Sequence, residues 1–370
     1  MQTNPKKLKQ LLNFVENLEE KIKTHPLHYL LWEPTLRCNL TCLHCSNHAH
    51  PNHTQNNELT TQEIKAELYD IAQHYDAKTI TFIATGGEPL MREDIIEVGS
   101  YAHKLGYHWG ITTNGIQLSK SKVKALKEAS LSSIAVSVDG LAPHHDQLRN
   151  QKGAYILIQK GIKNLLDEGF SNKLSILTCV NTLNIYHLLP FIEELIDQGI
   201  KQVRFSPIYQ QGRAVEHSSL QLTNQELYDL LLFIKKYRKK LKGVIDISLS
   251  DDGYYGSEFE CHIREHLHYC GAGIEWGAIL HDGSVSGSTN IAKKYIQGNI
   301  RKKSFVTIWE NKFHPYREGR EASFESYCQG CEEWLLCRGG GFHLLTENPT
   351  HQEACAYHKI RSIIDEKNHC

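Results

Sequence analysis

The chain has 370 residues, with 41 Lys and Arg against 42 Asp and Glu and a formal net charge of -1. This balance argues against nonspecific nucleic-acid binding as the main activity, because such binding needs an excess of positive charge. No stretch has the length and apolar character of a signal peptide or a membrane span. We therefore expect a soluble, cytoplasmic protein that binds neither membrane nor nucleic acid.

The first 28 residues are rich in lysine and carry apolar side chains on one face, which predicts an N-terminal helix over residues 1–28. From residue 29 to about 208, short β-branched and aromatic runs alternate with longer amphipathic ones. The predicted strands are 29–33, 79–84, 108–112, 133–138, 174–180 and 202–206. The predicted helices are 61–75, 93–105, 121–130, 154–168 and 185–198. Parallel neighbours need a crossover helix, so this order predicts a parallel sheet that curls into a complete or partial barrel.

The alternation stops after residue 215. A helical pattern at 224–241 and a strand-like run at 244–249 follow, and the remainder is rich in Cys and Gly with little helical periodicity. Because its apolar content is thin, we expect this tail to be organised by metal. The predicted divisions are an N-terminal helix (1–28), a core domain (29–215), a bridging segment (216–260) and a C-terminal domain (261–370).

The eleven cysteines fall mainly into two tight groups, which indicates metal or iron–sulfur ligation rather than disulfides in a reducing compartment. The first group, Cys38, Cys42 and Cys45, has the spacing C-x3-C-x2-C and follows the first predicted strand. Three thiolates are one too few to close the coordination of a four-iron cube, so one iron would stay open for another ligand. The alternative is a zinc site completed by a nearby histidine, His44, His48, His50 or His53.

Polar residues follow the second and fourth predicted strands, at the end of a parallel barrel where active sites lie. Gly86 and Gly87 remove two side chains from a loop, so that its backbone can approach a ligand, and Glu88 places a carboxylate there for an ammonium group. A simple turn is the alternative. Ser137 and Asp139 are two apart on a strand and face the same way, into the barrel. For Asp139 the alternative is capping of the following turn.

The second group comprises Cys328, Cys331, Cys337 and Cys355 near the C-terminus, with the first pair at chelating spacing. Four thiolates suit a closed iron–sulfur cluster, and a zinc site with four cysteine ligands is the alternative.

The three-cysteine loop followed by Gly-Gly-Glu-Pro at the tip of the second strand resembles the signature of radical S-adenosylmethionine (SAM) enzymes. The resemblance implies an α/β fold with a partial (β/α)6 TIM-like barrel. It also implies a [4Fe-4S] cluster on the first cysteine group whose open iron binds S-adenosylmethionine. The residues it assigns to S-adenosylmethionine are Gly86, Gly87, Glu88, Asn114, Ser137, Asp139 and Arg149. A surface pair with Asp146 is the alternative for Arg149.

The C-terminal segment is similar to the SPASM domain that many radical SAM peptide maturases carry, which implies a Cys-rich auxiliary iron–sulfur domain after the barrel. Ser288 and Gly341 stand where that family has cysteines for one of its two auxiliary clusters. The second cysteine group corresponds to the other cluster and is complete. The resemblance therefore implies a degenerate SPASM domain with one auxiliary [4Fe-4S] cluster, and Cys261 and Cys270 remain as leftover thiols.

In enzymes of this type, reductive cleavage of S-adenosylmethionine gives a 5′-deoxyadenosyl radical that removes hydrogen from a carbon. A fully ligated auxiliary cluster suits an electron acceptor, so we predict oxidative modification of a ribosomally synthesised precursor peptide by a cross-link or cyclophane-type bond. Asp251 and Asp252 are predicted proton acceptors, with a solvated acidic turn as the alternative. The expected partners are a precursor peptide with its leader and a flavodoxin- or ferredoxin-type electron donor.

Three other functions stay open. A spare Cys261 or Cys270 could serve as the hydrogen donor of a peptide epimerase. A radical SAM enzyme of the heme pathway, with one auxiliary cluster, would act on a tetrapyrrole. Outside enzymes, the chain would be a metal-bearing binding module.

Overall fold

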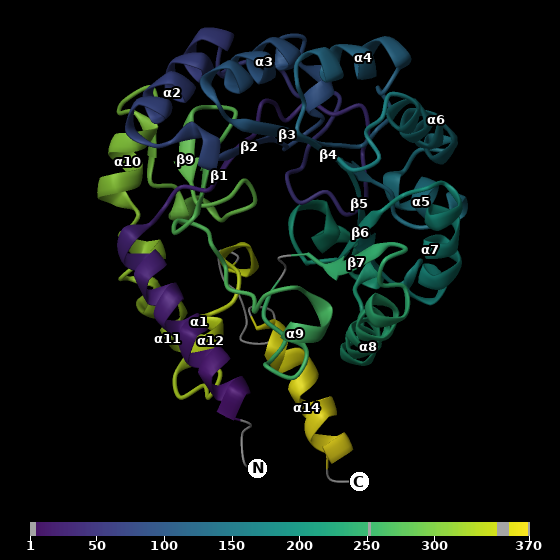
Figure 1. Ribbon diagram of the computed structural model, residues 1–370, viewed down its shortest axis with the longest axis vertical. Helices are drawn as coiled ribbons and strands as arrows, with labels where there is room; N and C mark the ends of the chain where they lie inside the picture. Colours follow the sequence, from purple (N-terminus) through teal and green to yellow (C-terminus); the bar gives the residue numbers. More distant parts are fainter. Residues whose placement is uncertain (1–4, 251–252, 346–354, 369–370) are drawn as a thin grey trace.

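The protein is built on one curved, mostly parallel sheet with helices on its outer side (Figure 1). The computed structural model describes residues 5–250, 253–345 and 355–368, so the predicted proton acceptors Asp251 and Asp252 lie outside the described residues. Over these ranges the sheet has ten strands in the order β10-β9-β8-β1-β2-β3-β4-β5-β6-β7. The strands are β1 (Tyr29–Trp32), β2 (Thr81–Ala84), β3 (His108–Thr113), β4 (Ser133–Ser137), β5 (Leu174–Val180), β6 (Gln202–Pro207), β7 (Asp246–Leu249), β8 (Trp276–Ile279), β9 (Ser284–Ser286) and β10 (Gly298–Asn299).

The helices alternate with the strands through the first two thirds of the chain, which confirms the predicted alternation. They are α1 (Pro5–Thr24), α2 (Thr61–His74), α3 (Ile95–Leu105), α4 (Lys120–Glu128), α5 (Ala142–Arg149), α6 (Ala154–Asp167), α7 (Leu188–Asp197) and α8 (Asn224–Lys240). The later helices are α9 (Glu260–Ile263), α10 (Phe305–Lys312), α11 (Arg320–Cys328), α12 (Trp334–Cys337) and α14 (Ala356–Asn368).

The sheet extends beyond the six predicted strands at both edges. β7, from the predicted bridging segment, pairs in parallel with β6. β8, from the predicted C-terminal domain, pairs in parallel with β1, so the C-terminal region continues the sheet of the barrel. The sequence pattern could not show this, because a strand's partner depends on long-range hydrogen bonds rather than on local periodicity. The proposed domain boundaries therefore remain a prediction.

The main core lies between the sheet and its outer helices. On β1, Leu30 and Trp32 are fully buried under the helices, whereas Leu31, which points the other way, is only half-buried. α2 begins at a capping box between Thr60 and Glu63, which satisfies amide donors at its first turn. Strand alternation of this kind leaves the inner face of the sheet available for polar side chains.

The carboxyl ends of the parallel strands carry the three-cysteine loop after β1, the glycine loop after β2 and the polar residues after β3 and β4. The C-terminal elements close the open side of the curved sheet, where α1, α11 and α12 lie on one side and α9 and α14 on the other (Figure 1). Contacts between α14 and α8, and between α1 and α12, hold them there. None of the described helices has the length and apolar character needed to cross a membrane.

Candidate functional site

The three cysteines of the first group lie together in a small, largely buried cluster with Leu40 and Ala49. Burial raises the pKa of Cys38 to about 12, and Glu88 and the other two thiols act in the same direction. Burial likewise raises the pKa of Cys42. The raised pKa values favour protonated thiols at Cys38 and Cys42, so ligation of a metal by these two would release protons.

The glycine loop packs against the chain that leads into these cysteines. The amide N–H of Gly87 donates to the carbonyl oxygen of Thr35 (2.9 Å), and that of Glu88 donates to Arg37 (2.8 Å). A Cβ atom on Gly87 would lie 2.4 Å from the Arg37 oxygen. The close approach that Gly87 permits is thus to the protein's own backbone, and a Cβ atom on Gly86 would lie 2.5 Å from the Glu33 side chain. The predicted contact of both glycines with a ligand remains a prediction.

Glu88 is fully buried and links the loops that follow β2 and β3 at the carboxyl ends of these strands. Its carboxylate accepts hydrogen bonds from the Thr113 hydroxyl (2.8 Å), the Asn114 amide (2.7 Å) and the Leu90 amide (3.1 Å). Burial raises the pKa of Glu88 although these donors favour the charged form. This carboxylate supports the rim, and its predicted role in holding an ammonium group stays a prediction.

Asn114, which directly follows β3, connects the end of this strand to the first cysteine. Its side-chain nitrogen donates to the Asn39 side-chain oxygen at 2.7 Å and lies 3.7 Å from the sulfur of Cys38. The geometry therefore brings Asn114 to the cysteine loop, as expected for a rim residue.

Asp139 and Arg149 form a buried ion pair directly behind the second cysteine. Arg149 Nε lies 2.6 Å from Asp139 Oδ2, and Arg149 Nη1 lies 3.7 Å from the sulfur of Cys42. Burial acts to raise the pKa of Asp139, but the charge of Arg149, together with His44, His145 and the Cys179 amide, holds that pKa below its usual value. The surface pair of Arg149 with Asp146 is not formed, since Asp146 instead accepts from the amides of Gly153 and Tyr155. Ser137, the last residue of β4, is half-buried.

Several residues at this site escaped the sequence prediction. Arg213 donates from Nε to the Cys42 carbonyl (2.8 Å) and from Nη1 to the Ala49 carbonyl (2.8 Å), and so spans the cysteine loop. His44 lies beside Asp139 and Arg149, and burial lowers its pKa to about 4. No sequence signal marks Arg213, because its contacts join distant segments. His44 was considered from the sequence only as a possible zinc ligand, and its place beside Asp139 and Arg149 was not predicted.

The zinc alternatives gain no support from the geometry. Among the residues that the structure describes, no three His, Cys, Asp or Glu side chains converge as ligands of a single metal ion.

The four cysteines of the second group line one cavity of about 270 Å³, walled also by Tyr254, Phe324 and Trp334. Burial raises the pKa of Cys328 to about 12, and it also raises those of Cys337 and Cys355. The amide of His358 donates to the sulfur of Cys355 at 3.3 Å. Four half-buried thiols around one hollow fit a fully ligated iron–sulfur cluster.

The residues next to the two missing auxiliary ligands pack against one aromatic side chain. Tyr316 is fully buried, and its hydroxyl accepts from the amide of Gly287, next to Ser288, at 3.2 Å. Its ring lies 4.4 Å, between centroids, from that of Phe342, which follows Gly341. Cys270 is buried in the same core, whereas Cys261 is exposed. Close aromatic packing around Tyr316 therefore supports the prediction of a single auxiliary cluster.

Comparison with known proteins agrees with this arrangement. Residues 32–195 match the family model described as the radical SAM superfamily, and residues 270–332 match the SPASM model, described as an iron–sulfur cluster-binding domain. The chain is 28% identical over 359 residues to the Fe-coproporphyrin III synthase of Methanosarcina barkeri, covering 89% of this chain and 88% of that protein. It is 28% identical over 322 residues to the mycofactocin maturase MftC of Mycolicibacterium smegmatis, covering 84% and 77%.

The fold is also that of a solved structure, native anSMEcpe with bound AdoMet, with a TM-score of 0.68, 19% identity and coverage of 93% of this chain and 100% of that chain. A radical SAM domain binds a four-iron cluster and S-adenosylmethionine, and a SPASM domain binds iron–sulfur clusters. The buried three-thiol loop and the four-thiol cavity suit these groups. The chain is therefore an enzyme of the radical SAM superfamily that carries a C-terminal SPASM-type iron–sulfur domain.

Proposed function

We propose that the enzyme removes hydrogen from a carboxylate-bearing tetrapyrrole and passes the remaining electron to its auxiliary cluster. The observation that carries the proposal is a cavity of about 720 Å³ that shares His358 and Arg361 with the hollow of the auxiliary cysteines. Cavities of a few hundred to about a thousand Å³ are typical of small-molecule sites.

One wall of this cavity is the segment after β6, including Tyr209, Gln210 and Gln211. The same segment packs on the first cysteine group. The amide of Arg213 donates to the Cys45 carbonyl at 3.0 Å, and a Cβ atom on Gly212 would lie 2.3 Å from that oxygen. The cavity is thus one backbone segment away from the three-cysteine loop.

The opposite wall is the start of α14. His358 and Arg361 line both this cavity and the hollow of the four auxiliary cysteines. A substrate held here would therefore contact the walls of both sites. This placement is suited to hydrogen removal at one side and electron transfer at the other.

The charge of the lining favours an anionic substrate. Lys359 and Arg361 line the cavity together with His343 and His358. Arg361 is already paired with Glu332 at 2.8 Å and with Asp365, the single carboxylate among the described lining residues, at 3.7 Å. Lys and Arg both recognise carboxylates, and Arg can do so with two parallel hydrogen bonds. The Methanosarcina relative is named as the synthase of an iron tetrapyrrole with carboxylate side chains, which is therefore its product. Two further relatives are named AdoMet-dependent heme synthases, and a tetrapyrrole carboxylate as substrate matches this lining.

The roles of the remaining residues follow from their geometry. Cys38, Cys42 and Cys45 would hold the first cluster, and Cys328, Cys331, Cys337 and Cys355 would hold the auxiliary one. When bound, S-adenosylmethionine and its cluster supply the one-electron chemistry that removes hydrogen from an unactivated carbon. Arg149 keeps a positive charge beside Cys42, while Asp139 compensates that charge in the buried rim. The cavity walls orient the substrate and limit water.

Oxidative cross-linking of a ribosomally made precursor peptide is the second candidate. It is favoured by the similarity to MftC, whose name describes a maturase. In this case the same cavity would hold the modified part of the peptide, and a leader would bind elsewhere. A flavodoxin- or ferredoxin-type protein as electron donor, and Asp251 and Asp252 as proton acceptors, are proposals common to both candidates.

The test uses the anaerobically purified holoenzyme with S-adenosylmethionine, dithionite and iron coproporphyrin III. We expect this tetrapyrrole to accelerate 5′-deoxyadenosine formation at least about tenfold, and its tetramethyl ester to do so far less, because the ester lacks the charges that Lys359 and Arg361 would bind. Replacing Lys359 and Arg361 by Met should abolish the difference, whereas the exposed Lys303→Met control should preserve it.

A different set of results would favour the peptide candidate over the tetrapyrrole. No acceleration by the acid, together with a loss of about two mass units from a peptide co-expressed with the enzyme, would replace the tetrapyrrole by the peptide candidate. An unchanged peptide mass with altered stereochemistry would indicate an epimerase.

A further inference from the structure

We propose that His281 is a positioning residue that joins the β8–β9 hairpin of the SPASM-type region to the three-cysteine loop of the barrel. It does so through Glu33 and Asn47, and it thereby fixes the part of the loop that carries Cys45. This inference goes beyond the proposed function, because it concerns the S-adenosylmethionine site and holds for either substrate.

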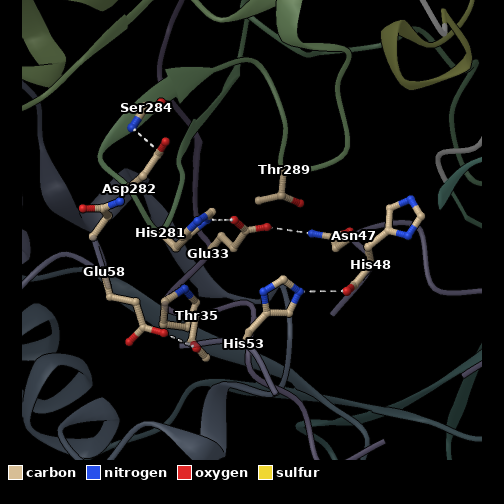
Figure 2. Close-up of polar contacts among 12 residues, drawn as sticks. Glu33, Thr35, Asn47, His48, His53, Glu58, His281, Asp282, Ser284 and Thr289 are labelled. Carbon is tan, nitrogen blue, oxygen red and sulfur yellow. Dashed lines mark hydrogen bonds and ion pairs between the residues drawn. The ribbon is translucent and has the colours of Figure 1, made fainter. Parts of the chain in front are cut away.

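Glu33 is the centre of the connection. It directly follows β1 and is 3% exposed. One carboxylate oxygen lies 2.6 Å from His281 Nδ1, and the other accepts from the side-chain nitrogen of Asn47 at 2.7 Å. Figure 2 shows the three side chains in a row, with Glu33 between His281 and Asn47. A single carboxylate thus bridges two segments that are more than two hundred residues apart in the sequence.

The backbone around His281 strengthens the same connection. The amide of Glu33 donates to the carbonyl of Ile279 at 2.9 Å, and the amide of Leu59 donates to the carbonyl of His281 at 2.8 Å. Arg301 adds a bond from Nη2 to the carbonyl of Glu58 at 3.1 Å. The hairpin therefore fixes both ends of the segment from residue 33 to 59, and the Glu33 bridge fixes its middle at Asn47.

Asn47 transmits this restraint to the cysteines, because it lies two residues after Cys45. On its other side the loop is covered by Gly212, whose close approach to the Cys45 and Ser46 backbone leaves no space for a side chain. The loop is held between these two contacts. Displacement of Asn47 would therefore be expected to displace Cys45.

The electrostatics support a charged His281. The hydrogen bond that His281 donates to Glu33 raises the pKa of His281, and the charges of Asp282 and Glu58 act in the same direction. A buried carboxylate is costly without a compensating partner. Loss of the imidazole would leave Glu33 buried with only the neutral amide of Asn47.

The test compares His281→Leu, which removes the partner, with His281→Gln, which can keep a hydrogen bond to Glu33 without the charge. His314→Leu is the matched control, since it removes an exposed histidine of the same C-terminal region whose ion pair is with neighbouring Glu318. The proteins are reconstituted anaerobically. Amide hydrogen exchange of residues 44–50 and the electron paramagnetic resonance spectrum with and without S-adenosylmethionine are measured.

We expect exchange over residues 44–50 to accelerate about 30-fold in His281→Leu, the factor that corresponds to loss of one charge-assisted hydrogen bond. His281→Gln should fall between that variant and the parent, and the control should match the parent. The spectral change on adding S-adenosylmethionine should weaken in the same order at equal iron content. A role in packing alone would lower the unfolding temperature without this ordered spectral effect.

Two results would overturn the proposal. In the first, residues 44–50 exchange in His281→Leu as they do in the parent. In the second, the loop exchanges faster but the spectrum with S-adenosylmethionine remains that of the parent. Neither result bears on the tetrapyrrole assignment, which the carboxylate-dependence of 5′-deoxyadenosine formation tests separately.

Discussion

The buried pair of Asp139 and Arg149 gives the most demanding prediction about the active-site rim. The two side chains are 2.6 Å apart and almost fully buried. Removing one member of such a pair leaves an uncompensated buried charge, which typically costs about 3–5 kcal/mol. At roughly 1.4 kcal/mol per decade, the local opening equilibrium around α5 should shift by about a hundredfold or more.

The perturbations are Asp139→Asn, Arg149→Met and the double variant. Each single variant should accelerate amide exchange at the end of β4 and in α5 by about two orders of magnitude. The double variant should recover much of this protection, because no unpaired charge remains. It should not recover S-adenosylmethionine cleavage, since Cys42 would still lack the cation that lies 3.7 Å from its sulfur.

The assay is exchange measured by mass spectrometry, together with 5′-deoxyadenosine formation at equal iron content. Single variants with parent-like exchange would refute the electrostatic reasoning about stability. A double variant with parent-like cleavage would show that Arg149 serves only to neutralise Asp139.

Three further predictions concern the auxiliary site, His281 and Glu88. Cys355→Ser should lose about four irons per chain in a colorimetric iron assay, whereas Cys270→Ser should keep them; equal loss in both would contradict a single auxiliary cluster. Because the pKa of His281 is raised, the stability it provides should be complete below about pH 6.5 and should be lost as the pH rises through the raised value. The difference in loop exchange between the parent and His281→Gln should therefore shrink towards alkaline pH, and a constant difference would argue against a charged imidazole. Glu88→Gln should destabilise the loops after β2 and β3 by about 1–3 kcal/mol, because the new amide nitrogen would face the Asn114 amide donor. The expected signs are a lower unfolding temperature and faster exchange of the Asn114 amide. Unchanged values of both would exclude a supporting role for the Glu88 carboxylate.

The periodicity of the sequence was sufficient to predict the barrel, since alternating apolar runs and amphipathic stretches report directly on strands and crossover helices. It could not predict that β8 continues the sheet beside β1. That strand has only four residues, and its partner lies more than two hundred residues earlier.

The candidate site was predictable where residues are close in the sequence and not where they meet across the fold. The spacing of Cys38, Cys42 and Cys45 was sufficient to identify the first group. The bridge from His281 to Glu33 was not visible, because neither residue belongs to a local motif and their contact depends on the tertiary fold.

The glycine loop shows a different limit of sequence-based prediction. A pair of glycines indicates that something approaches the backbone closely, but the sequence does not specify what. Here the approaching group is the backbone at Arg37, so the motif first serves to build the cysteine loop.

The most direct test of the proposed substrate follows hydrogen from substrate to product. Iron coproporphyrin III deuterated on its side-chain carbons is incubated anaerobically with the holoenzyme, S-adenosylmethionine and a reductant, and the 5′-deoxyadenosine is analysed by mass spectrometry. We expect deuterium in the 5′-deoxyadenosine of the parent enzyme and little in the variant with Met at positions 359 and 361. Unlabelled 5′-deoxyadenosine, formed at the same rate with or without the tetrapyrrole, would contradict the proposed substrate.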